Sequence, residues 1–173
     1  MISDVLLGNL MSVGAMVTDA ASSNQHSVRR MLLLQCFSQG FYCVSSFVLK
    51  GYSAVVQNGI SLFRNILAIR KIESSVLQWI ITILGIVLGL WFNNRGLLGI
   101  LPVVANAEYT IAVFTVKDNQ KALLWAFLIN AAMFAVFNFS IMNFVGGVAS
   151  LVIIVSTARA LIWNRKKQGL QSE

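Results

Sequence analysis

Two ionisable residues, Glu108 and Arg159, lie well inside long apolar stretches of the sequence. Glu108 precedes Lys117 by nine residues and Arg159 precedes Arg165 by six. In a helix that rises 1.5 Å per residue, they therefore lie roughly 13 Å and 9 Å from those charged ends. A charge among apolar side chains is costly unless it meets an opposite charge or water. The similar depths predict a charge pair between Glu108 and Arg159. This pair would act either as a proton-coupling group or charge clamp, or as an ion pair that only fixes packing.

Side-chain amides form a second group of polar residues within the apolar stretches. They can hydrogen-bond a neutral polar solute without burying a charge. The alternative role is hydrogen bonding between helices, worth about 0.6–2 kcal/mol for each bond. That alternative is favoured for any single amide, but the set comes from several stretches and indicates a polar cavity. Together with Glu108, the predicted substrate-binding residues are Asn58, Gln57, Asn106, Glu108, Asn130 and Gln35.

No spacing of residues in the chain is typical of an enzyme. The sequence lacks a nucleophile elbow, a phosphate-binding glycine loop and a cluster of metal ligands. Cys36 and Cys43 are seven residues apart, and we interpret them as small packing residues. His26 is interpreted as a solvated loop residue. We therefore expect no catalytic residues, no metal and no cofactor.

The composition indicates the environment in which these polar residues lie. Hydrophobic residues make up 57% of the 173 residues and charged ones 11%, against about 25% charged residues in a soluble domain. A bilayer-spanning helix needs roughly 20 apolar residues. The apolar stretches lack the alternation of period two that a membrane barrel requires. The sequence therefore predicts an all-α membrane protein with seven transmembrane helices, over Ile2–Ala20, Met31–Leu49, Ser53–Ile69, Val76–Phe92, Leu97–Val116, Ala122–Phe137 and Phe144–Trp163.

The basic residues predict how these helices are oriented. With seven spans, one side of the membrane collects nine basic residues and the other collects two, Lys50 and Arg95. Basic residues favour the cytoplasmic side, which predicts a cytoplasmic C-terminus and an external N-terminus. Membrane lipid is an expected partner and nucleic acid is not. The first stretch lacks a basic leader and carries Asp4, so we expect no cleaved signal peptide. The larger basic set comprises Arg29, Arg30, Arg70, Lys71, Lys117, Lys121, Arg165, Lys166 and Lys167.

A short pattern, R-x5-R-K, occurs twice at a spacing of 95 residues. It is formed by Arg64, Arg70 and Lys71, and again by Arg159, Arg165 and Lys166. A repeat in the same sense predicts two parallel three-helix repeats, at 1–71 and 97–173, joined by a linker helix at 72–96. At this spacing Arg64 corresponds to Arg159. We interpret Arg64 as a long side chain that extends its charge to the membrane surface.

Several segments resemble the YgjV family of bacterial inner membrane proteins. They are Arg29–Gln35 (RRMLLLQ), Gly51–Ala54 (GYSA), Gln57–Asn65 (QNGISLFRN) and Leu101–Val103 (LPV). The three-one-three arrangement is similar to that of the SWEET and PQ-loop transporters. The resemblance implies a seven-helix, SWEET-like membrane protein without implying a particular substrate. Two departures from the SWEET pattern argue against a symmetric sugar pocket: Pro102 is the single proline, and Asn58 corresponds to Ile153 at the spacing of 95.

These observations favour a transporter or facilitator of a small polar solute, working by alternating access. The alternative is a non-transporting membrane scaffold or partner subunit. Gly85 and Gly89 form a small-xxx-small motif that allows close helix packing, either within the chain or in a homo-oligomer. A continuous polar cavity that reaches Asn58, Asn106 and Glu108 would favour the carrier. A closed core in which these side chains only satisfy one another would favour the scaffold.

Overall fold

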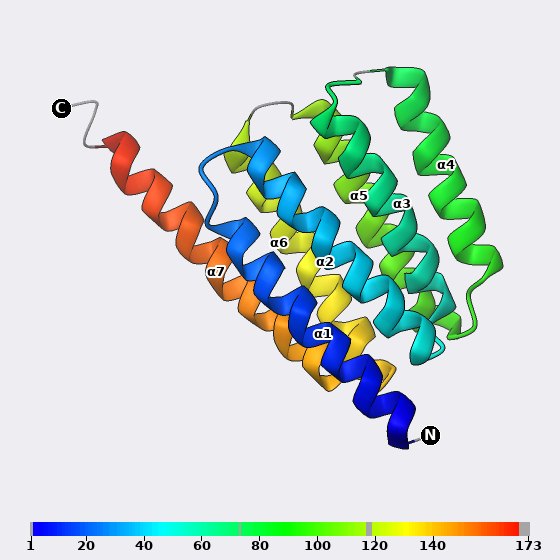
Figure 1. Cartoon of the computed structure of the whole chain (residues 1–173). Coiled ribbons are helices and arrows are strands. Elements are labelled where there is room, and N and C mark those ends of the chain that lie inside the picture. Colours follow the sequence, from blue (N-terminus) through cyan, green and yellow to red (C-terminus); the bar gives the residue numbers. More distant parts are fainter. Residues whose placement is uncertain (1, 73, 117–118, 170–173) are drawn as a thin grey trace.

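The chain folds into helices throughout the part that the structure describes. The computed structural model describes residues 2–72, 74–116 and 119–169, with side chains as far as residue 162. Within these ranges there is no strand, which confirms the predicted all-α class. The helices are α1 (Ile2–Ser23), α2 (Val28–Val48), α3 (Tyr52–Ile69), α4 (Ser75–Trp91), η1 (Gly96–Gly99, a 3₁₀ turn), α5 (Ile100–Thr115), α6 (Gln120–Ser140) and α7 (Phe144–Gly169) (Figure 1).

Most of the helices, but not α3 and α4, have the length and apolar composition expected of membrane spans. Five of them are long and apolar enough to cross a membrane: α1, α2, η1 with α5, α6, and α7 as far as Ile162. The shorter helix α4 is also apolar. Large apolar side chains such as Phe37 and Val155 are exposed on the outside, whereas Gln35 and Asn65 are fully buried. This distribution is the reverse of that in a soluble domain and suits a lipid environment.

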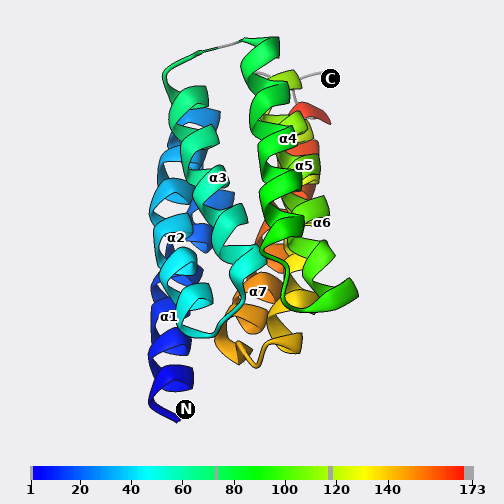
Figure 2. The same ribbon diagram turned by 90° about the vertical axis from the view of Figure 1, so that its right-hand side faces the viewer.

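The helices pack as two groups of three with α4 at one side. α1, α2 and α3 form the first triplet, and α5, α6 and α7 form the second triplet (Figure 2). The triplets meet where α1 packs on α7 and where α5 packs on α3. α4 contacts α3 and α5.

Local structure recurs in the two triplets at a spacing of 92 residues. The turn from α2 to α3 contains Lys50 with φ 57°, and the turn from α6 to α7 contains Met142 with φ 61° (142 − 50 = 92). The caps of α2 and α6, Ser27 and Asn119, are also 92 residues apart. Each cap side chain accepts a hydrogen bond from the backbone N–H three residues further on.

The predicted spacing of 95 residues is therefore wrong by three. At the observed spacing, Arg64 corresponds to Ser156 and Arg159 corresponds to Leu67. Three residues are a little less than one helical turn, so a shift of three leaves the apolar faces nearly superposed. The R-x5-R-K pattern therefore suggested a repeat, but it aligned residues that do not occupy equivalent positions.

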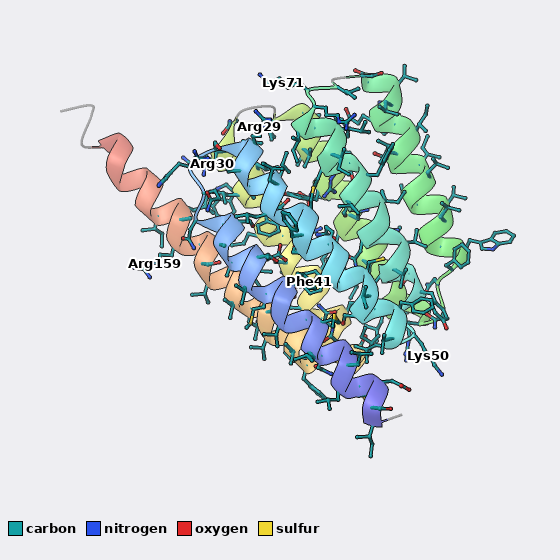
Figure 3. The ribbon with its side chains drawn as sticks, in the orientation of Figure 1. Arg29, Arg30, Phe41, Lys50, Lys71 and Arg159 are labelled. Carbon is teal, nitrogen blue, oxygen red and sulfur yellow. The ribbon has the colours of Figure 1, made fainter. Side chains whose placement is uncertain are left out.

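Basic side chains gather at one end of the bundle. Arg29, Arg30 and Lys71 lie at this basic end, while Lys50 lies at the opposite end (Figure 3). Arg95 is also at the opposite end, because its Nη2 donates to the Leu49 carbonyl, at 3.3 Å. The predicted sorting of charge holds for these residues. Lys117 lies outside the described residues, as do the side chains of Arg165, Lys166 and Lys167.

The small-xxx-small motif of α4 packs inside the chain. Gln57 of α3 donates from Nε2 to the Gly85 carbonyl, at 2.7 Å. A β-carbon placed on Gly89 would overlap the Gln57 amide and would lie 2.8 Å from Val103 Cγ2. Both glycines are buried, so the motif is used to bring α4 against the chain's own helices.

Gly89→Ala is expected to lower the stability of the purified protein by about 1–3 kcal/mol, the range typical of overpacking. The added methyl group displaces the Gln57 amide, which cannot move without losing its bond to Gly85. Thermal unfolding in detergent measures the effect. Gly59→Ala is the matched control, since a β-carbon there meets nothing within 4 Å. Equal melting temperatures for the two variants would contradict the expected close packing.

Candidate solute site between the helix triplets

An internal cavity lies between the two triplets. Its volume is about 30 Å³, which is room for roughly one or two water molecules. Residues of α1, α2, α3, α5, α6 and α7 contribute to its wall. The lining residues are Asp19, Gln39, Tyr42, Ser46, Asn58, Ser61, Arg64, Tyr109, Phe127, Asn130, Ala131, Phe134, Asn138, Ser150 and Ile153.

Two Asn–Ser contacts in the wall are related by the 92-residue spacing. Asn58 Nδ2 donates to Ser46 Oγ, at 3.4 Å. Asn138 Nδ2 donates to Ser150 Oγ, also at 3.4 Å. Ser46 corresponds to Asn138 and Asn58 to Ser150, so the same contact is made in each triplet with the two residue types exchanged.

The remaining corresponding positions give the cavity two different walls. In three further pairs, the residue of the first triplet is polar and its counterpart 92 residues later is apolar. The pairs are Gln39 with Ala131, Tyr42 with Phe134, and Ser61 with Ile153. We call the first set the polar wall and the second set the apolar wall. The cavity is thus symmetric in position and asymmetric in chemistry.

Arg64 is the cation that lines the cavity. It is 1% exposed, so the prediction that its charge reaches the membrane surface is wrong. Nε donates to Asn65 Oδ1 at 3.0 Å, and Nη1 donates to Asn106 Oδ1 at 2.8 Å and to Thr110 Oγ1 at 3.1 Å. The guanidinium carbon lies 4.7 Å from the centre of the Tyr109 ring. Among the described residues, no carboxylate pairs with Arg64 and no acceptor takes a hydrogen bond from Nη2.

Asp19 supplies a carboxyl group to the same cavity. It is 2% exposed, on the inner face of α1. The carboxylate lies beside the hydroxyl groups of Ser38 and Tyr42. Its Oδ1 is nevertheless buried without a hydrogen-bond partner, as is the Tyr42 hydroxyl. Asp19 and Arg64 therefore face one cavity without forming an ion pair with each other.

Two of the six predicted substrate-binding residues, Asn58 and Asn130, line the cavity. Asn58 donates to Ser46, as described above. Asn130 donates from Nδ2 to the Ala105 carbonyl at 2.9 Å, which leaves its Oδ1 without a bond among the described residues.

The other predicted amides hold helices together. Asn106 Nδ2 donates to Gln57 Oε1 at 2.7 Å, and Asn106 Oδ1 accepts from Arg64 and Ser61. Gln35 and Tyr109 exchange two hydrogen bonds, at 2.9 Å and 3.0 Å. For Gln57, Asn106 and Gln35, hydrogen bonding between helices is therefore the observed role.

The predicted charge pair between Glu108 and Arg159 is not formed. Glu108 is half-buried outside the cavity, its Oε2 has no hydrogen-bond partner, and the cation that acts on it is Arg64. Arg159 lies on the outer side of α7 (Figure 3), in a surface groove beside Asn24 and Val155. The prediction used depth along the helices alone, but each residue also adds a 100° rotation, so depth does not give the face on which a side chain lies.

Two polar contacts join the triplets on either side of the cavity. At the opposite end, Ser12 of α1 donates to Asn143 Oδ1 at 3.1 Å and lies 2.9 Å from Ser45 Oγ. At the basic end, the hydroxyl oxygens of Ser23 in α1 and Thr157 in α7 are 3.0 Å apart. All of these residues are buried. Asp19 lies between the two contacts along α1, so the triplets are held together on both sides of the cavity.

Comparison with known proteins gives one match. The family model Imp-YgjV, described as a bacterial inner membrane protein, matches residues 6–168. No curated protein and no solved structure matches the chain.

Proposed function

Because the chain belongs to the Imp-YgjV family of bacterial inner membrane proteins, we propose that it carries a small polar solute across that membrane by alternating access. The observation that supports this most strongly is the cavity between the triplets, lined at corresponding positions of both. Carriers built from repeats hold their site at the interface between the repeats, near the middle of the membrane. An interior with charged and amide side chains also suits a solute path better than a purely structural core.

The proposal includes a SWEET-like architecture. In it, all seven helices cross the membrane, with parallel repeats at 1–71 and 97–173 and a linker at 72–96. Support comes from the 92-residue recurrence of caps and turns and from the lateral position of α4. The basic end faces the cytoplasm in this proposal, since Arg29, Arg30 and Lys71 lie there. The N-terminus is then external.

The two polar contacts between the triplets suggest how access alternates. The closed cavity, at about 30 Å³, represents an occluded state that holds no more than water. Separation of Ser23 from Thr157 would open the basic end, while Ser12 and Asn143 stay together at the opposite end. The reverse movement would open the other side. Each opening breaks neutral hydrogen bonds, worth about 1 kcal/mol each in net terms, which suits a reversible conformational change.

The scaffold alternative was based on the small-xxx-small motif of α4, and the structure does not leave this motif free for a partner. Gly85 and Gly89 are buried against the chain's own α3 and α5, so the motif offers no free surface to a partner. The cavity criterion gives a divided result. Asn58 lines the cavity, which favours the carrier, whereas Asn106 is bonded to Gln57 and Glu108 does not line the cavity, which favours the scaffold.

Filling the cavity is expected to abolish solute uptake. Ala131 belongs to the apolar wall and is 3% exposed, so Ala131→Leu places additional carbon atoms in a space that holds only water. Its neighbour Ala132 is exposed on the outside of α6, so Ala132→Leu is the matched control. Uptake into reconstituted vesicles is measured with a panel of sugars, polyols, amino acids and carboxylic acids, after size-exclusion chromatography has shown that both variants are folded.

Two outcomes would contradict the proposed function. One is the absence of uptake of every solute by the wild type. The other is equal uptake by the Ala131→Leu and Ala132→Leu variants, because transport through the cavity cannot be insensitive to its filling.

A further inference from the structure

We infer that the solute is a small zwitterion of the amino-acid type, which places its carboxylate at Arg64 and its ammonium group at Asp19. This inference rests on the proposed function and specifies the class of solute. It is based on a guanidinium and a carboxyl group that are both buried and line one cavity without forming an ion pair with each other.

Arg64 requires an anion that the protein does not supply. Three hydrogen bonds, to Asn65, Asn106 and Thr110, fix the guanidinium by Nε and Nη1. The other nitrogen, Nη2, has no acceptor among the described residues, and Arg64 lines the cavity. A guanidinium buried without an ion pair is costly, and a carboxylate oxygen accepts a stronger hydrogen bond from Nη2 than a neutral oxygen does. The three hydrogen bonds made by Nε and Nη1 thus orient Nη2 towards a carboxylate in the cavity.

Asp19 requires a cation in the same way. Its Oδ1 and the Tyr42 hydroxyl are buried without hydrogen-bond partners, and both side chains line the cavity. An ammonium group carries three donors and no acceptor, so it can satisfy both oxygens. Glu108 is the other acid near Arg64, but it lies outside the cavity and does not line the path of a solute.

The two charges together select a zwitterion over the simpler alternatives. A neutral sugar could hydrogen-bond both groups but would leave both charges uncompensated. A simple anion would satisfy Arg64 and bring a second negative charge towards Asp19. A simple cation would do the reverse. A zwitterion compensates both charges and enters the membrane interior without net charge.

The apolar wall fits the remainder of such a molecule. Ala131, Phe134 and Ile153 face the polar wall across the cavity. They can contact a short aliphatic side chain while the charged groups lie against Arg64 and Asp19. The small volume of the closed cavity favours a short side chain over a long one.

A binding experiment on the purified full-length protein tests the inference. Thermal unfolding in detergent is followed with glycine, L-alanine and L-leucine as zwitterions, and with propionate, ethylamine and glycerol as an anion, a cation and a neutral polyol at equal concentration. Ligands that bind the folded state raise the melting temperature. We expect at least one zwitterion to raise it more than any of the other three probes. An equal or larger rise with propionate, ethylamine or glycerol, or no rise with any zwitterion, would overturn the inference.

The variant Asp19→Asn tests the ammonium site independently of the carboxylate site. The substitution keeps the shape of the side chain and removes its charge. We expect the affinity for the zwitterion to fall by about tenfold or more, while the affinity for propionate is unchanged or higher. Asp4→Asn, at the exposed start of the same helix, is the control and is expected to bind like the wild type. An unchanged preference for the zwitterion in Asp19→Asn would overturn the assignment of the ammonium site.

Binding and uptake distinguish failure of this inference from failure of the proposed function. Zwitterion binding without uptake of any solute would contradict the carrier and leave the ligand class standing. Uptake of a sugar or polyol without zwitterion binding would contradict the ligand class and leave the carrier standing.

Discussion

A disulfide between positions 23 and 157 is expected to stop solute movement, and its reduction is expected to restore it. The hydroxyl oxygens of Ser23 and Thr157 are 3.0 Å apart, so cysteines at these positions suit the short Cβ–Cβ distance of a disulfide, about 3.5–4.5 Å. The bond would fasten α1 of the first triplet to α7 of the second at the basic end. Alternating access requires these helices to separate there, so a covalent link removes one of the two open states.

The measurement is uptake or exchange in vesicles before and after oxidation, and again after addition of a reductant. Cys36 and Cys43 are free and are replaced by alanine in the background to prevent other bridges. Each single-cysteine variant, treated with the same oxidant, controls for oxidation as such. Transport by the crosslinked protein at the uncrosslinked rate would show that this contact does not open during the cycle.

Arg64→Lys is expected to keep the positive charge and to lose solute binding by about a hundredfold or more. The guanidinium makes three bonds to the protein and still has Nη2 unused. An ammonium group has three donors in all, so lysine cannot hold Asn65, Asn106 and Thr110 and also contact a solute. Hydrogen bonds to charged groups contribute about 1.5–3 kcal/mol each, and loss of a two-bond contact accounts for the expected change.

The affinity is measured by thermal unfolding with the solute that stabilises the wild type most. Arg159→Lys is the matched control, because Arg159 is exposed in a surface groove at the basic end, away from the central cavity. Wild-type affinity in Arg64→Lys would mean that the guanidinium makes no contact with the solute. It would leave Arg64 with a packing role only.

Properties that depend on position along a helix were predictable from the sequence. The lengths of the apolar stretches predicted the helices to within a few residues, because a bilayer of fixed thickness sets a minimum number of apolar residues. The predicted stretch Met31–Leu49, for example, is the helix Val28–Val48 in the structure.

Properties that depend on direction around a helix were not predictable from depth. Tyr109 lines the cavity and Glu108 does not, although the two residues are adjacent and differ by one 100° step. Asp19 falls near the end of the predicted stretch Ile2–Ala20, but its position on the cavity depends on how α1 packs against α2 and α7. The partner of Gln35 is Tyr109, 74 residues away, and nothing in the local sequence of either residue predicts the other.

The repeat itself was visible, but its spacing was predicted from the wrong residues. Charged residues at helix ends recur easily, because every span needs them. The caps Ser27 and Asn119 carry more information, since each sits at the first residue before a helix and accepts the same backbone hydrogen bond. An alignment of the two halves that starts from these two caps gives the spacing of 92 residues directly. At that spacing, Asn58 is aligned with Ser150 and both line the cavity.

The exchanged pairs, Ser46 with Asn58 and Asn138 with Ser150, have a consequence for how such chains diverge. Selection on a hydrogen bond between two positions constrains the two residues jointly and leaves each one free to change if the other compensates. The halves of this protein can therefore drift apart in identity at both positions while the contact between them persists. An alignment of the two halves that scores each position separately would count two mismatches here. An alignment that scores pairs of contacting positions would count one conserved hydrogen bond.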